Sequence, residues 1–89
     1  MAPWETLRPF WSRNLARALV VKRGRPGEVK TLADARDLLH SLPERRRQQP
    51  AWQHAAELLL RAARSRAPQD IVDVTGQLHR ALASEGWLA

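Results

Sequence analysis

The stretch from Ala18 to Pro43 constrains the fold more than any other part of the chain. Its first residues, Ala18 to Lys22, are apolar and β-branched enough to form a strand. The next residues, Arg23 to Gly27, carry the glycines and the proline that tight turns require. Glu28 to Lys30 then runs back antiparallel, so this stretch predicts a β-hairpin.

The alternation of side chains along the first strand gives the hairpin two different faces. Leu19 and Val21 point to one face and Ala18 and Val20 to the other, because successive residues of a strand point to opposite sides. A two-stranded hairpin alone is only marginally stable in water. We therefore expect helices from the rest of the chain to cover one of its faces.

A helix is predicted to follow the hairpin directly. Thr31 and Asp34 have the spacing of a capping box, with Asp in place of the usual Glu, and place the helix start at Leu32. Pro43 ends this helix. Its apolar positions are Leu32, Ala35, Leu38, Leu39 and Leu42.

Two further helices are expected, each opened by a proline. The first begins near Pro50 and carries an apolar stripe of Trp52, Ala55, Ala56, Leu59, Ala62 and Ala63. The second begins near Pro68, with Ile71, Val74, Leu78, Ala81 and Leu82 facing inward. Leu58 and Leu60 widen the apolar surface of the first helix, which is therefore expected to contact more than one neighbour. The polar residues between Pro43 and Pro50 are expected to form a connection.

Three features near the end of the chain give local predictions. Gly76 lies inside the last helix, where glycine costs about 1 kcal/mol relative to alanine, and this suggests a close crossing with the small residues of the preceding helix. Gly86 fits a left-handed C-cap, with Trp87 folding back as its apolar contact. Leu88 and Ala89 are candidates for a short edge strand.

The expected fold class is α+β, an N-terminal β-hairpin packed against three α-helices, with the short C-terminal edge strand as an option. Residues 15–89 form a single small domain in this interpretation. Residues 1–14 form an N-terminal arm that is rich in aromatic side chains, and its alternative is a partly ordered tail.

The order of these features resembles a known family. The strand at Ala18 to Val21, the return strand at Val29 to Thr31, the Leu42-Pro43 helix end and the Pro50-Ala51-Trp52 helix start resemble the small bacterial proteins grouped as domain of unknown function 982. The likeness extends from Phe10 to Leu88. It implies a compact domain of one hairpin and three helices, and it implies no established activity, catalytic residue or cofactor.

Composition narrows the functional classes. The 89 residues include no cysteine, which excludes disulfides and thiolate metal sites and suits a reducing cytosol, so a cytoplasmic location is expected. The longest apolar run, Ala18 to Val21, is too short to span a bilayer, and no membrane association is expected. The net charge of +6 raises the prior for nucleic acid or acidic partners. The same charge also arises when a GC-rich genome encodes arginine, and the basic residues are spread along the chain, which favours a compositional origin.

The sequence contains no convincing catalytic constellation. His40, His54 and His79 fall on three different expected helices, and His54 with Glu57 is best interpreted as a surface contact. The turn from Gly24 to Gly27 lacks the length and the following lysine of a phosphate-binding loop. We therefore expect no enzyme activity, no cofactor, no bound metal and no small-molecule substrate.

Two binding functions remain, and the first is a protein-interaction or accessory module. Trp4, Phe10 and Trp11 in the arm are candidates for anchoring a partner or a second copy, because aromatic residues dominate interface energetics. The alternative is nucleic-acid binding without sequence preference, through phosphate contacts of the hairpin turn and the connection after Pro43. The residues of this basic patch are Lys22, Arg23, Arg25, Lys30, Arg45, Arg46 and Arg47.

Overall fold

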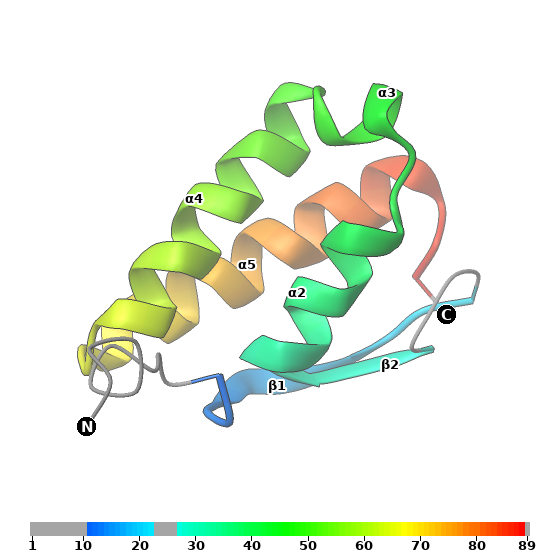
Figure 1. Cartoon of the computed structure of the whole chain (residues 1–89). Coiled ribbons are helices and arrows are strands. Elements are labelled where there is room, and N and C mark those ends of the chain that lie inside the picture. The colour runs from blue at the N-terminus through cyan, green and yellow to red at the C-terminus, as the bar shows by residue number, and fades with distance from the viewer. Residues whose placement is uncertain (1–10, 23–26, 89) are drawn as a thin grey trace.

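A computed structural model describes residues 11–22 and 27–88 of the chain. The elements in chain order are the strands β1 (Asn14–Val20) and β2 (Glu28–Thr31) and the helices α2 (Leu32–Ser41), α3 (Glu44–Arg47), α4 (Pro50–Arg64) and α5 (Pro68–Glu85). The hairpin forms one layer, α2 and α5 pack on one of its faces, and α4 packs against α2 and α5 (Figure 1). The α+β class predicted from the sequence is confirmed.

The hairpin has the two faces that the alternation predicts. Leu19 and Val21 are buried, whereas Ala18 and Val20 are exposed. Leu19 pairs with Val29 of β2, and the Val21 amide closes the turn by donating to the Gly27 carbonyl at 2.6 Å. The buried face of the hairpin therefore points at the helices.

The start of β1 differs from the prediction, because the strand begins at Asn14 rather than at Ala18. Leu15 is buried, but Arg17, two residues further on, is exposed. The register between the strands shifts between Asn14 and Leu19, so the simple alternation is lost there. Because of this irregularity, the first half of the strand does not show the apolar alternation of period two by which a strand is predicted from sequence.

Helix α5 supplies a partner for the irregular part of β1. The Ala16 amide donates to Thr75 Oγ1 at 3.0 Å, and the Thr75 hydroxyl donates to the Ile71 carbonyl at 2.7 Å. Thr75 is only 1% exposed, so both bonds lie in or beside the core. One buried hydroxyl thus joins the strand to the helix.

The capping box at the start of α2 is confirmed in both directions. Thr31 Oγ1 accepts the Asp34 amide at 3.1 Å, and the Asp34 carboxylate accepts the Thr31 amide at 3.2 Å. The same carboxylate also accepts the Lys30 amide at 3.0 Å. Asp replaces Glu in this box without loss of either bond.

The expected connection between Pro43 and Pro50 contains a short helix, α3, which the sequence interpretation missed. The Pro43 carbonyl accepts the amide of Arg46 at 2.9 Å and begins this turn. Glu44 lies in its first turn and the three arginines in its last, the arrangement that favours a helix dipole. Charge placement was the available signal, because the segment has no apolar periodicity.

The close crossing predicted at Gly76 is wrong. Helices α4 and α5 lie against each other, yet a Cβ atom placed on Gly76 would meet no atom within 4 Å. The glycine lies at the open side of this helix pair and not in its contact.

The C-terminal predictions agree with the structure over the described residues. Gly86 ends α5 with a φ of +73°, and the Trp87 amide donates to the Leu82 carbonyl at 3.0 Å. Trp87 packs against Trp52, with ring centroids 6.1 Å apart. Leu88 forms an isolated antiparallel bridge with Val21, whereas Ala89 lies outside the described residues.

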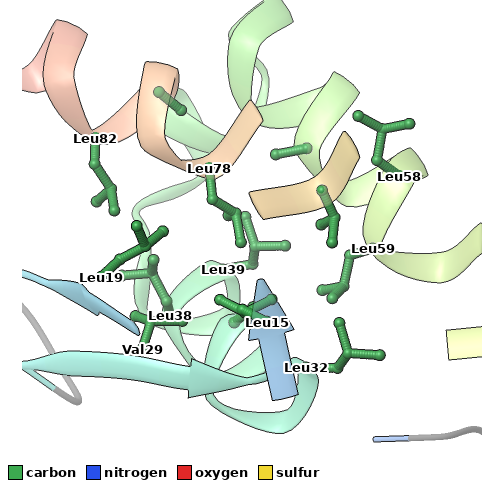
Figure 2. Packing of buried hydrophobic residues seen from close by; sticks show 14 of the residues in the cluster. Leu15, Leu19, Val29, Leu32, Leu38, Leu39, Leu58, Leu59, Leu78 and Leu82 are labelled. Carbon is green, nitrogen blue, oxygen red and sulfur yellow. The ribbon is translucent and has the colours of Figure 1, made fainter. Parts of the chain in front are cut away.

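The core fills the space between the hairpin and the helices. Figure 2 shows the side chains that converge there, among them Leu15, Leu19, Val29, Leu32, Leu38, Leu39, Leu58, Leu59, Leu78 and Leu82. The largest fully buried side chain is Trp52, which is 1% exposed. Each element except α3 contributes buried apolar residues, so the hairpin and the helices form one core.

Replacing Thr75 with valine should destabilise the fold. Thr75→Val keeps the shape of the side chain but leaves the Ala16 amide without its acceptor, which costs about 1–3 kcal/mol. Urea unfolding followed by circular dichroism measures this loss. Ser84→Ala is the control, because its hydroxyl donates to Ala81 of the same helix, and it should change stability by less than about 0.5 kcal/mol. Equal losses in the two variants would contradict the role of Thr75.

Candidate functional site

The predicted basic patch is only partly assembled among the described residues. Lys22 is exposed directly after β1, and Arg23 and Arg25 lie outside the described residues. Lys30 lies further along β2, where its ammonium group contacts the Glu28 carboxylate at 3.0 Å. The hydrogen bond to Glu28, together with the negative charge of that residue, raises the pKa of Lys30. The charge of Lys30 is therefore matched within its own strand.

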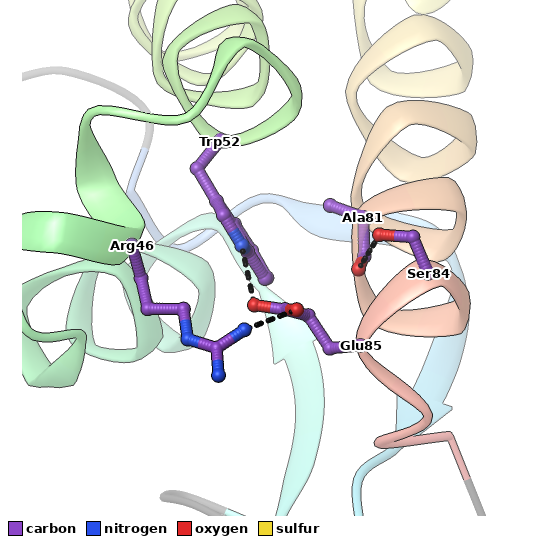
Figure 3. A network of polar contacts seen from close by, with 5 residues as sticks. All are labelled: Arg46, Trp52, Ala81, Ser84 and Glu85. Carbon is purple, nitrogen blue, oxygen red and sulfur yellow. Dashed lines mark hydrogen bonds and ion pairs between the residues drawn. The ribbon is translucent and has the colours of Figure 1, made fainter.

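The three arginines of α3 do not share a face. Arg45 is exposed, and Arg47 lies at the edge of a groove between α2 and α4. Arg46 turns toward α5 and forms an ion pair with Glu85 (Figure 3). Its guanidinium also lies over the Trp87 ring, 5.6 Å from the centroid. Arg45 and Arg46 line one surface hollow with Pro43 and Gln49, whereas Arg47 lines the groove between α2 and α4.

Glu85 is the centre of this polar contact. Its carboxylate accepts from Arg46 through one oxygen and from the Trp52 indole nitrogen, at 3.3 Å, through the other (Figure 3). The Glu85 side chain is only 9% exposed. A carboxylate so shielded from water needs charged or polar partners, and Arg46 and Trp52 provide them. Arg46 therefore has a structural role.

Trp87 links this cluster to the hairpin. Its carbonyl accepts the Lys22 amide at 2.6 Å, while its ring packs below Arg46 and beside Trp52. The end of β1 and the helix α3, which are far apart in the sequence, consequently lie at the same end of the molecule (Figure 1). Of the predicted patch, Lys22 and the α3 arginines are brought to this end.

A second feature is an apolar groove of about 300 Å³ between α2 and α4. Its lining residues are Trp11, Arg36, Leu39, His40, Arg47, Ala56, Leu59 and Leu60. Leu39 and Leu59 belong to the core and form the apolar floor, whereas Leu60 is 46% exposed. We refer to this surface as the α2–α4 groove.

Trp11, one of the three predicted arm residues, lines the α2–α4 groove. Its backbone carbonyl accepts the Ala33 amide at 2.9 Å, and the Arg36 guanidinium lies 5.0 Å from its ring centroid. Trp11 is half-buried against the core. Trp4 and Phe10 lie outside the described residues.

Sequence reasoning did not find the α2–α4 groove. The expectation that α4 contacts several neighbours is confirmed, since it packs against α2, α3 and α5. Leu58 is buried, but Leu60 remains largely uncovered. The available signal was an apolar stripe on α4 wider than its neighbours can cover.

The described residues offer little to a metal ion. No three His, Asp or Glu side chains converge within residues 11–22 and 27–88. His54 and Glu57 make the predicted surface contact at 3.9 Å, and both side chains are exposed.

Arg46→Ala should destabilise the protein, because it removes the cation beside the shielded Glu85 carboxylate and leaves it the Trp52 indole as a hydrogen-bond donor at 3.3 Å. We expect a loss of about 1–2 kcal/mol, less than for a fully buried pair because Arg46 is itself partly exposed. Urea unfolding measures the loss, and Arg45→Ala, at the exposed neighbouring position, should change stability by less than about 0.5 kcal/mol.

A double-mutant cycle separates the ion pair from other effects of truncation. In a Glu85→Gln background, Arg46→Ala should cost less, because no carboxylate remains to be compensated. A loss that is the same in both backgrounds would rule out the ion pair as its cause.

Comparison with known proteins gives no relative of this chain. No protein-family model matches it, and no match was found among curated proteins or among solved structures. Within the described residues, no helix is both long and apolar enough to cross a membrane.

Proposed function

We propose that this chain is a non-enzymatic protein-interaction module, and that its α2–α4 groove binds an acidic partner segment carrying a large apolar side chain. The observation that carries the proposal is the combination of an apolar floor with a basic rim. The described residues that line the groove include three basic or titratable side chains, Arg36, His40 and Arg47, and no acid.

The floor of the groove favours an apolar side chain. Leu60 is 46% exposed next to the buried Leu59, so apolar surface continues from the core to the outside. Trp11 closes one end with its half-buried ring. A volume near 300 Å³ is at the small end for binding pockets and suits one or two side chains better than a whole ligand. Burial of such anchors is the main source of affinity at protein interfaces.

The rim favours carboxylates. Among the described residues, Arg47 has no ion-pair partner, and the one ion-pair partner of Arg36 is the exposed Asp37, at 3.5 Å. Guanidinium groups bind carboxylates with two parallel hydrogen bonds. The stacking of Arg36 on Trp11 holds one guanidinium at the edge of the apolar floor. An acidic segment would therefore find charge partners on both sides of its apolar anchor.

Nucleic-acid binding without sequence preference is the second candidate. It is supported by the placement of Lys22 and α3 at one end of the molecule through Trp87. It is weakened by the use of Arg46 and Lys30 in internal ion pairs. The resemblance to domain of unknown function 982 is likewise a proposal from the sequence, and it adds no activity to either candidate.

The groove proposal predicts selective binding of acidic amphipathic peptides. The probe is a fluorescein-labelled helical peptide of about fifteen residues, with Leu and Trp on one face and Glu beside them. Fluorescence anisotropy should show binding that Leu60→Glu weakens by about tenfold or more, because the new carboxylate repels the peptide and removes apolar surface. Val72→Glu is the matched control, since Val72 is similarly exposed but lies on α5, outside this groove.

A second peptide and a nucleic-acid probe complete the test. Exchanging every Glu of the peptide for Gln should remove most of the binding. Failure of the acidic peptide to bind at any accessible concentration, or equal losses in Leu60→Glu and Val72→Glu, would contradict the proposal. A labelled oligothymidylate that binds with a steep salt dependence, weakened by Lys22→Glu and not by Leu60→Glu, would favour the second candidate.

A further inference from the structure

Glycine at position 76 lowers the stability of helix α5, and no contact within the monomer explains why it is there. It lies in the interior of α5, where glycine is less favourable than alanine by about 1 kcal/mol. Glycine is required where φ is positive or where another chain segment approaches closely, but Gly76 is helical and nothing lies within 4 Å of a Cβ at this position. The space that its missing side chain leaves is open to the outside.

That space belongs to a groove of about 460 Å³ between α4 and α5, on the other side of α4 from the α2–α4 groove. The α5 side of this groove is formed by Val72, Asp73, Gly76, Gln77 and Arg80. Val72 is 52% exposed, a large fraction for a valine in a helix that contributes to the core. We refer to this surface as the Gly76 groove.

The two charged side chains that α5 contributes to the Gly76 groove have opposite signs and lie on either side of Gly76. Asp73 and Arg80 are seven residues apart, so they lie on the same side of the helix, about 10.5 Å apart along its axis. The midpoint between them falls between Gly76 and Gln77. Two antiparallel copies of this helix that cross at the midpoint would therefore place Asp73 of each level with Arg80 of the other.

The side chains around the midpoint leave Gly76 accessible. Gln77 turns toward α4, where its amide donates to the Ala51 carbonyl at 3.1 Å. Asp73 accepts from Gln69 at 2.8 Å and keeps its second oxygen for another donor. Within the described part of the chain, Arg80 has no acidic partner. Asp73 and Arg80 on the same surface of a second copy would each supply the charge that the other lacks.

We propose that two copies of this chain associate through the Gly76 groove, with their α5 helices antiparallel around a two-fold axis at Gly76 and Gln77. A two-fold interface must be complementary to itself, and the Asp73 and Arg80 positions meet that condition. Glycine at the axis lets the two helix backbones approach closely, while Val72 of each copy is covered by the other. This association involves a different surface from the α2–α4 groove and does not depend on the proposed function.

The rim contributed by α4 limits the strength of this association. His54 and Arg61 are exposed there, so each copy brings an additional cation for which the opposite surface has no dedicated acid. A pair of helices also makes a small interface. We therefore expect a weak dimer, with a dissociation constant on the order of 10–100 µM.

Sedimentation equilibrium over a concentration series tests the proposal directly. The mass of the full chain should rise from 10.1 kDa toward twice that value. Gly76→Gln should weaken the dimer by at least about tenfold, because the new side chain fills the space in which the second helix packs. The same variant should raise the urea midpoint of the monomer at low concentration, because glutamine is the better helix former and its Cβ meets no atom within 4 Å. Weaker association with higher monomer stability excludes misfolding as the cause.

Charge exchange tests the antiparallel geometry. Asp73→Arg and Arg80→Asp should each weaken the dimer by about tenfold, since each places like charges opposite each other. The double variant restores opposite charges and should recover association. Val72→Glu should also weaken the dimer, whereas Leu60→Glu, on the far side of α4, should leave it unchanged. A monomeric wild-type chain at about 1 mM, a dimer indifferent to Gly76→Gln, or a double variant no better than the single ones would overturn the proposal.

Discussion

The fold depends on one constraint: the apolar face of a two-stranded hairpin must be covered by other parts of the chain. Leu19, Val21 and Val29 form a buried face too small to be stable in water by itself. Helices α2 and α5 cover this face, and α4 packs against both of these helices, so all three bury their apolar faces in the same core. The hydroxyl of Thr75 adds a polar link where the pairing of the strands is irregular. Hairpin and helices are therefore stable only together, as one core.

The same dependence decides which of the many basic residues are available for binding. Trp52 is buried beneath α3 and α5, and its indole nitrogen needs an acceptor, which Glu85 supplies. The shielded Glu85 carboxylate then needs a cation, and Arg46 is within reach. The positive charge of Arg46 is thus taken up by an ion pair within the protein. The count of 15 Lys and Arg residues in the sequence therefore overstates how many basic side chains a partner meets.

Helix α4 separates two open grooves of different chemistry. On one side, the described residues of the α2–α4 groove combine exposed apolar surface at Leu60 with basic side chains and no acid, so this groove is complementary to a molecule unlike itself. On the other side, α5 places Asp73 and Arg80 about a glycine in the Gly76 groove, and these two charges would complement those of a second copy. A dimer formed by the second surface would present the first surface twice, and paired weak sites raise the avidity for a partner that has repeated acidic segments.

The sequence by itself determined the features that depend on near neighbours. The capping box of Thr31 and Asp34, the left-handed Gly86 and the buried faces of α2, α4 and α5 all follow from contacts between residues close in the chain or from a helical period. Only the tertiary structure decided that Arg46 turns inward while Arg47 stays outside, that Leu60 remains exposed, and that the side of α5 at Gly76 is open. The physical reason is that covering a side chain requires a neighbour from a distant part of the chain, and neither the period of a helix nor the composition of a segment specifies where that neighbour packs.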